Sequence, residues 1–159
     1  MWHLRTMVTR LIVMRHAESS LDYPGLSDHD RPLSAKGQHD APRMAQALSD
    51  RGWIPELILV SSSRRTIETL EGISPVIDEA RIEIRSEIYH AGLSSLSKQL
   101  EDLLEDGTTM IIGHNPGSEV LINHLTGLWE VMPAAAVALI EKNAEEWRLI
   151  EVLRPEELS

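Results

Sequence analysis

Residues 11–19 read LIVMRHAES, in which four consecutive apolar residues are followed by a polar run. A short apolar run of this kind indicates a buried strand, and the change to Arg15, His16 and Glu18 indicates that the strand ends in polar surroundings. In an open parallel sheet, ligands bind in the crevice beyond the carboxyl ends of the strands. Arg15 and His16 are therefore candidates to face a ligand, and the rest of the chain must decide whether they do.

The length of 159 residues suits one domain with one hydrophobic core. We expect a single domain over residues 1–159, with residues 1–9 as an N-terminal extension and Met7 as an alternative start to Met1. The sequence holds no apolar run long enough to span a bilayer, no secretory signal and no cysteine. These features favour a cytoplasmic protein without disulfides, thiolate nucleophiles or cysteine metal sites, and without a membrane partner.

The formal net charge of -10 argues against general nucleic-acid binding, because such binding depends on a basic surface that neutralises phosphates. If the protein acts on a phosphorylated group, a few Arg and His side chains must form a positive pocket inside an acidic envelope. Nucleic acid is therefore not an expected partner.

Apolar runs alternate with helical patterns along most of the chain, which predicts one α/β domain with a mostly parallel sheet. Helices are predicted from an N-cap at Ser34 to Arg51, from about residue 64 to the break at residues 74–75, from Ser94 or Ser95 to residue 106, and from an N-cap at Asn115 to Gly127. Strands are predicted at residues 11–14, 57–60, 82–85 and 108–112, with an antiparallel hairpin formed by residues 134–140 and 147–153.

Three of the predicted buried strands end in cationic or potentially cationic residues: Arg15 and His16, Arg64 and Arg65, and His114. In a parallel sheet these strand ends share one edge, so that the side chains can meet in one crevice. Arginine gives bidentate hydrogen bonds to phosphoryl oxygens, and the helix N-terminus expected beside His114 also favours an anion. No HExxH, Ser-His-Asp or GxxxxGK[ST] pattern suggests another chemistry.

Four segments together resemble the histidine phosphatase superfamily: residues 15–17 (RHA), 30–37 (DRPLSAKG), 60–69 (VSSSRRTIET) and 113–116 (GHNP). Within it, the short chain is similar to the SixA-like phosphohistidine phosphatases, and the similarity covers most of residues 10–141. The resemblance implies a three-layer α/β/α fold of the phosphoglycerate mutase-like type, with a mostly parallel central sheet and no metal or cofactor.

The resemblance also implies roles for individual residues. His16 is expected to be the nucleophile that takes the phosphoryl group, while Arg15, Arg65 and His114 surround the phosphoryl oxygens. Asn115 is expected among the substrate-binding residues. Arg65 is preferred to Arg64 because the family arginine lies four residues before a threonine, which here is Thr69.

The sequence departs from the family pattern at Ala17, Ser62 and Glu68, where glycine, proline and glutamine are usual. No single carboxylate matches the proton donor of larger members. Glu18, which we count among the catalytic candidates, and Asp28 are close in sequence to the first strand end, and Glu87 lies in the loop after residue 85. The four histidines at positions 29, 39, 90 and 124 are interpreted as ordinary surface or helix residues.

We therefore expect a metal-independent phosphatase that works through a covalent phosphohistidine on His16. The resemblance to the SixA-like branch implies a protein phosphohistidine as the substrate. With such a substrate the unmatched proton donor matters less, because an imidazole leaving group needs little help from a proton donor. A small-molecule phosphomonoesterase of the same mechanism and a non-catalytic phosphate-binding module are the alternatives. The chain is expected to be a monomer or a weak dimer.

Overall fold

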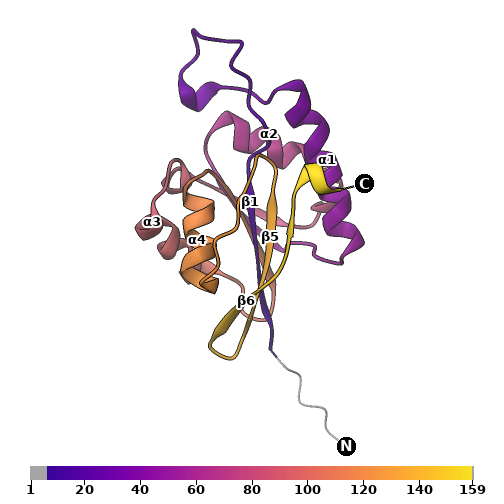
Figure 1. The fold of residues 1–159 in the computed structure, drawn as a ribbon, viewed down its shortest axis with the longest axis vertical. Coiled ribbons are helices and arrows are strands. Elements are labelled where there is room, and N and C mark those ends of the chain that lie inside the picture. Colours follow the sequence, from indigo (N-terminus) through magenta and orange to yellow (C-terminus); the bar gives the residue numbers. More distant parts are fainter. Residues whose placement is uncertain (1–6, 159) are drawn as a thin grey trace, which may run out of the picture.

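The computed structural model describes residues 7–158 and places six strands in one sheet, in the order β3-β2-β4-β1-β5-β6 (Figure 1). Strands β1 to β4 are mutually parallel, and β5 runs antiparallel to both β1 and β6. The predicted α/β class with a mostly parallel sheet is confirmed. The strands are β1 (Thr9–Arg15), β2 (Leu57–Ser61), β3 (Arg81–Arg85), β4 (Thr108–Gly113), β5 (Val137–Asn143) and β6 (Glu146–Leu153).

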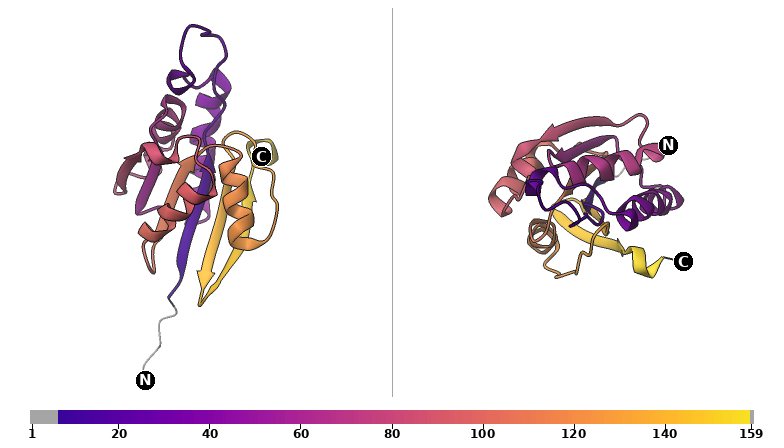
Figure 2. Two further views of the ribbon diagram at one scale, coloured as in Figure 1. Left: turned by 90° about the vertical axis from the view of Figure 1, so that its left-hand side faces the viewer. Right: turned by 90° about the horizontal axis from the view of Figure 1, so that it is seen from above.

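In the described part of the chain, four α-helices cover the two faces of the sheet: α1 (Ala35–Asp50), α2 (Arg64–Gly72), α3 (Leu93–Gln99) and α4 (Gly117–Thr126). In β1, Ile12 and Met14 join the core cluster that contains residues of α1 and α2, whereas Leu11 and Val13 join the cluster with residues of α3 and α4. This alternation follows from the two-residue period of a strand. The result is the predicted three-layer α/β/α arrangement, which Figure 2 shows from two further sides.

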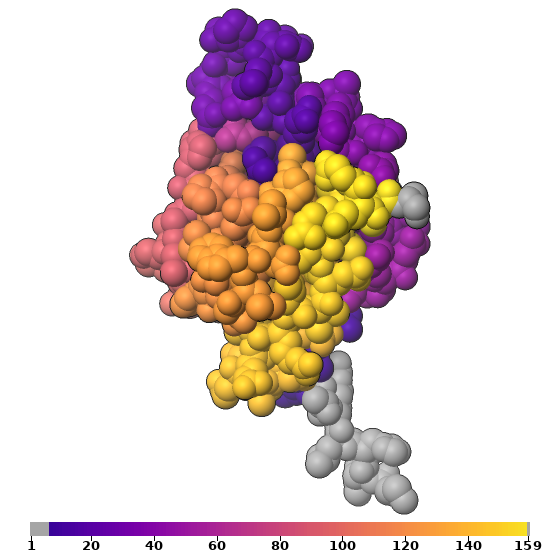
Figure 3. All heavy atoms as spheres, viewed as in Figure 1, coloured from indigo at the N-terminus to yellow at the C-terminus, as the bar shows by residue number. Residues whose placement is uncertain are grey.

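The chain that follows β1 rises beyond the end of the sheet and forms the upper end of the molecule (Figure 3). This extension contains a 3-10 turn at Asp28–Asp30 and leads back to α1. The carboxyl ends of β1, β2 and β4 all point toward it, because these strands are parallel neighbours. The strand ends that carry the candidate residues therefore lie together beneath this extension.

Several predicted boundaries were wrong. Helix α4 has Pro116 as its N-cap and begins at Gly117, because the Asn115 amide binds the Met132 carbonyl instead of capping the helix. Helix α3 begins at Leu93 and gives way after Gln99 to a 3-10 turn at Leu100–Asp102, so it does not reach residue 106.

The hairpin and the N-terminal segment also differ from prediction. Strand β5 begins at Val137, since residues 134–136 form a turn in which Ala135 has a positive φ of 69°. Thr9 belongs to β1 and not to an N-terminal extension. Most of the predicted extension, including Met1, lies outside the described residues, whereas the alternative start Met7 is described.

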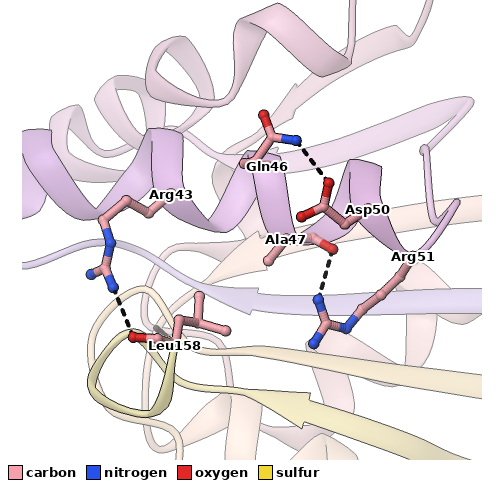
Figure 4. Close-up of a pocket in the computed structure, with 6 residues that line it drawn as sticks. All are labelled: Arg43, Gln46, Ala47, Asp50, Arg51 and Leu158. Carbon is pink, nitrogen blue, oxygen red and sulfur yellow. Dashed lines mark hydrogen bonds between the residues drawn. The ribbon is translucent and has the colours of Figure 1, made fainter.

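A hollow between α1 and the C-terminal segment shows how the end of the chain is held (Figure 4). Arg43 donates to the carbonyl oxygens of Pro155 and Leu158 at 3.2 and 3.3 Å. Arg43 also pairs with Asp40, and Arg51 pairs with Glu151 of β6. Because both arginines are already paired with carboxylates, we assign this hollow to packing rather than to ligand binding.

Candidate active site

A polar pocket lies at the carboxyl ends of β1, β2 and β4, which are adjacent in the sheet. The end of β1 contributes Arg15 and His16, the first turn of α2 contributes Arg65, and the end of β4 contributes His114. The pocket is lined by Arg15, His16, Ser19, Asp28, Arg31, Arg65, His90, His114 and Asn115. The structure thus brings together side chains that are up to 100 positions apart in the sequence.

His16 is buried, and its two ring nitrogens have different partners. Nδ1 lies 2.7 Å from the carbonyl oxygen of Ala17, which can only accept, so Nδ1 carries the proton. Nε2 is then unprotonated, and Arg65 Nε donates to it at 3.3 Å. Burial, followed by the charges of Arg65 and Arg15, lowers the pKa of His16 to about 4. His16 therefore presents a lone pair on Nε2 at neutral pH.

Backbone contacts from three elements hold His16 in place. Its N–H donates to the Gly113 carbonyl of β4, and its carbonyl accepts from the Ala135 N–H before β5. The next residue, Ala17, donates its N–H to Thr69 Oγ1 at 2.9 Å, and that hydroxyl donates to the Arg65 carbonyl at 2.7 Å. Helix α2 therefore positions both the histidine and the arginine of the pair.

Arg65, and not its neighbour Arg64, lies in the pocket. The Arg65 side chain is 4% exposed and donates to the backbone carbonyl and the carboxylate of Asp28 at 2.7 and 3.1 Å. Arg64 is exposed on α2 and pairs with Glu68 four residues later. The structure thus places Arg65, which the spacing to Thr69 favoured, in the pocket and Arg64 outside it.

His114 and Arg15 face His16 across the pocket. The His114 ring lies 5.3 Å from the His16 ring, between centroids, and its Nε2 is 2.8 Å from Ser61 Oγ. Burial, and then the nearby His16 and Arg65, lower the pKa of His114 to about 3. Arg15 donates one amino group to the Met132 carbonyl at 3.1 Å.

Three buried side-chain atoms make no hydrogen bond within residues 7–158, and all three belong to pocket residues: Arg15 Nε, His114 Nδ1 and Asn115 Oδ1. Buried polar atoms are normally paired, so atoms of this kind mark a place where a ligand can bind. We assign the donor role in the bond between Ser61 Oγ and His114 Nε2 to Ser61, because Ser61 Oγ already accepts from the Ser63 N–H. Nδ1 of His114 then carries the ring proton and becomes a donor. Arg15 Nε and His114 Nδ1 are then donors suited to an oxyanion.

Comparison with known proteins identifies the family. The family model for the histidine phosphatase superfamily (branch 1) matches residues 11–93. The chain belongs to this superfamily. An uncharacterised chloroplast protein of Arabidopsis thaliana is 36% identical over 151 residues, which are 87% of this chain and 68% of the plant protein.

Solved structures of SixA proteins share the fold. The structure of an Agrobacterium tumefaciens protein assigned as the phosphohistidine phosphatase SixA superposes with a TM-score of 0.84 at 28% identity, covering 92% of this chain and 98% of that one. A protein histidine phosphatase SixA in complex with tungstate gives a TM-score of 0.81 at 22% identity, over 94% and 99% of the two chains. The predicted family and its fold are both confirmed.

Of the three carboxylates considered as proton donors in this superfamily member, one lines the pocket. Glu18 is exposed outside the pocket and accepts from Ser34 Oγ at 2.9 Å. Glu87 is also exposed outside it and accepts from Ser86 Oγ at 3.3 Å. Asp28 lies at the pocket rim.

The contacts of Asp28 favour its ionised form. Its carboxylate accepts from Tyr89 Oη at 2.5 Å and from His90, Arg65 and Arg31. The hydrogen bond from Tyr89, followed by those from His90 and Arg65, holds the pKa of Asp28 well below its ordinary value. Asp28 is therefore a carboxylate at neutral pH and a poor proton donor.

Three residues that line the pocket, Ser19, Arg31 and His90, were not among the predicted site residues. His90, interpreted as an ordinary surface histidine, lines the pocket with its ring 5.3 Å from that of His114. Arg31 lies at the pocket rim and also pairs with Asp28 at 3.0 Å. The strand-end argument could have found His90, since it follows β3, the fourth parallel strand.

Neither a metal site nor a membrane span emerges from residues 7–158. No group of three or more His, Cys, Asp or Glu side chains in that range is arranged to hold a metal ion, and no helix in it is long and apolar enough to cross a membrane.

Proposed function

We propose that this protein is a phosphatase that transfers a phosphoryl group to His16 Nε2 and then to water. One observation carries the proposal: the unprotonated Nε2 shares a pocket with Arg65 and with the unpaired donors of Arg15 and His114. Phosphoryl transfer is catalysed mainly by positioning of the reactants and by stabilisation of the charge on the phosphoryl oxygens. A nucleophile surrounded by hydrogen-bond donors that can bind these oxygens provides both.

The two steps use the same groups. In the first step, the Nε2 lone pair attacks phosphorus in line with the leaving group, while Arg15, Arg65 and His114 bind the equatorial oxygens. The ring becomes positively charged, and the Ala17 carbonyl stabilises that charge by accepting from Nδ1–H. In the second step, water attacks the phosphohistidine and releases inorganic phosphate. One difficult displacement is thereby divided into two easier ones.

We further propose that the substrate is a phosphohistidine side chain of a protein. The SixA neighbours are described as phosphohistidine phosphatases, which supports this substrate class. The rim residues Asp28 and His90 have side chains that are 43% and 54% exposed, so a residue on another protein can approach the pocket. A small phosphomonoester hydrolysed by the same mechanism is the competing substrate class.

The test compares p-nitrophenyl phosphate with a histidine-containing protein phosphorylated by phosphoramidate. Wild-type protein should hydrolyse both, and His16→Ala should abolish turnover of both. His124→Ala, which removes an exposed histidine from α4, is the matched control and should retain full activity. Hydrolysis of the aryl ester alone would favour a small-molecule substrate, and no turnover of either substrate would overturn the proposal.

Chelation tests the metal-independent mechanism. The proposed steps use only His and Arg side chains, so EDTA should leave the turnover of p-nitrophenyl phosphate unchanged. Loss of activity in EDTA that added metal restores would contradict the mechanism.

A further inference from the structure

His90 occupies a special position in the backbone. It follows the 3-10 turn Ser86–Ile88 that extends β3, and it has a positive φ of 51°. A non-glycine residue in this left-handed region is uncommon and costs free energy, and such residues cluster at functional sites. The turn places the His90 ring at the pocket rim, 4.1 Å from the Tyr89 ring and 5.3 Å from the His114 ring, between centroids.

The rim is the side of the pocket where a leaving group must depart. In-line displacement puts the leaving atom opposite the attacking nitrogen. His16 is 7% exposed and lies deep in the pocket, whereas the His90 side chain is 54% exposed. A phosphoryl group bound over His16 Nε2 therefore directs its leaving group toward the solvent side, where His90 lies.

Asp28 orients the His90 ring. Its Oδ2 lies 2.9 Å from His90 Nε2, and the same carboxylate is held by Tyr89, Arg65 and Arg31. A fixed carboxylate on one ring nitrogen of a histidine selects the tautomer and stabilises the imidazolium. His90 Nδ1 makes no hydrogen bond within the described part of the chain, so this nitrogen is available to a substrate.

Other titratable groups at the pocket are less suited to deliver a proton. Glu18 and Glu87 lie outside it, and Asp28 is held as a carboxylate by its donors. His114 has its pKa lowered to about 3, so it is neutral at pH 7 and serves as a donor to phosphoryl oxygens. Imidazole is the side-chain group that ordinarily exchanges protons near neutral pH, and His90 is the remaining histidine of the pocket besides the nucleophile.

We propose that His90, oriented by Asp28, gives the leaving group its proton and later takes one from the attacking water. This inference rests on the proposed function. In the first step, the bond from phosphorus to the leaving nitrogen or oxygen breaks as the bond to His16 Nε2 forms. The proton on His90 Nδ1 moves to the leaving atom. In the second step, water gives a proton to Nδ1 as its oxygen bonds to phosphorus, and the His16–phosphorus bond breaks.

The test uses two aryl phosphates whose leaving groups differ in basicity. Phenolate needs a proton on departure far more than p-nitrophenolate does. The variant His90→Asn suits the experiment, because Asn tolerates the left-handed conformation at this position but cannot transfer a proton. We expect kcat/KM for phenyl phosphate to fall by about 10²-fold or more, and that for p-nitrophenyl phosphate by less than about tenfold.

Activity on p-nitrophenyl phosphate also shows that the variant is folded, and His124→Asn is the matched control. In His90→Gly, added imidazole should restore the hydrolysis of phenyl phosphate. Equal losses on both substrates, or no loss on either, would overturn the role of His90 while leaving the phosphatase proposal intact. If the wild-type protein hydrolyses neither ester and no phosphohistidine protein, the proposed function fails and this role fails with it.

Discussion

At the scale of single residues, burial sets the protonation state of the two central histidines. His16 and His114 are 7% and 5% exposed, and both lie near the Arg65 guanidinium. Burial disfavours the charged imidazolium, and the neighbouring cation adds to this effect. Because the folded protein keeps both rings neutral at pH values where the unfolded chain protonates them, the free energy of unfolding must depend on pH.

We predict that stability falls between about pH 6.5 and pH 4. Above pH 6.5, His16 is neutral in both the folded and the unfolded state, so it contributes no pH dependence. Below pH 6.5, the unfolded state binds a proton that folded His16, with its pKa lowered to about 4, does not bind. This difference removes on the order of 3 kcal/mol of the free energy of unfolding by pH 4. Urea unfolding from pH 7 to pH 4.5 measures the loss.

The variant His16→Gln isolates this contribution. It cannot titrate, so its free energy of unfolding should fall less steeply over the same pH range, whereas His124→Gln should keep the wild-type slope. If the free energy of unfolding falls equally steeply with decreasing pH in His16→Gln and in the wild type, the lowered pKa of His16 is contradicted.

The hydroxyl of Thr69 gives a second prediction at the residue scale. It accepts from the Ala17 N–H and donates to the Arg65 carbonyl, so Thr69→Val leaves a buried N–H unpaired next to the nucleophile. We expect a loss of about 1–3 kcal/mol in the free energy of unfolding and a lower kcat. Urea unfolding and steady-state kinetics measure both effects.

Thr126→Val is the matched control, because Thr126 donates to the Ile122 carbonyl in the same i to i−4 geometry but lies at the far end of α4. It should lower stability without lowering kcat. If Thr69→Val retains full kcat, the hydrogen bond from the Ala17 N–H to Thr69 Oγ1 does not position His16.

At the scale of elements, the start of α1 supports the turn after β1. Ser34 donates its backbone N–H to the Glu18 carbonyl at 2.8 Å, and its side chain caps the helix at the Gly37 N–H. Gly37 packs so closely that a Cβ atom there would lie 2.2 Å from the Glu18 carbonyl oxygen. The contact between α1 and this turn thus requires glycine at position 37.

We predict that Gly37→Ala destabilises the protein by about 1–3 kcal/mol, because the backbone at Glu18 must move. In a helix without such a contact, the same substitution stabilises by up to about 1 kcal/mol, so the sign of the change is diagnostic. Thermal and urea unfolding measure it. Gly25→Ala is the control, since a Cβ atom at position 25 would have open space within 4 Å. A neutral or stabilising Gly37→Ala would refute the close contact.

The elements also show how far the sequence could predict the site. Apolar runs identified β1, β2 and β4, and the rule for parallel strands then placed Arg15, Arg65 and His114 at one edge. Glu18 follows the same strand end, but the turn directs its carboxylate to Ser34. Local pattern predicts where a strand ends, whereas the direction of a side chain in the following turn depends on contacts with distant elements.

His90 and Asn115 illustrate the same limit. His90 reaches the pocket because Asp28, 62 positions earlier, holds its ring. Asn115 resembled an N-cap, but its amide binds the Met132 carbonyl 17 positions later. The position of His90 after β3 could have placed it near the pocket, but its contact with Asp28 and the contact of Asn115 with Met132 have no periodic signal in the sequence.

At the scale of the whole molecule, the pocket joins segments that are otherwise separate. Its residues come from the ends of β1 and β4, the extension after β1, the start of α2 and the turn after β3. The overall net charge is -10, yet Arg15, Arg31 and Arg65 gather at this one place. An oxyanion bound there contacts several segments at once, so binding must stabilise the fold as a whole.

We predict that tungstate or vanadate raises the melting temperature of the protein. A ligand at 100 times its Kd that binds only the folded state adds about 2.7 kcal/mol to the free energy of unfolding. Arg65→Gln should lose most of this shift, because it removes the guanidinium beside His16 Nε2. Arg64→Gln should keep the shift, since Arg64 is exposed and pairs with Glu68 outside the pocket. Equal shifts in the two variants would show that the anion binds elsewhere, because these neighbouring arginines differ mainly in whether they line the pocket.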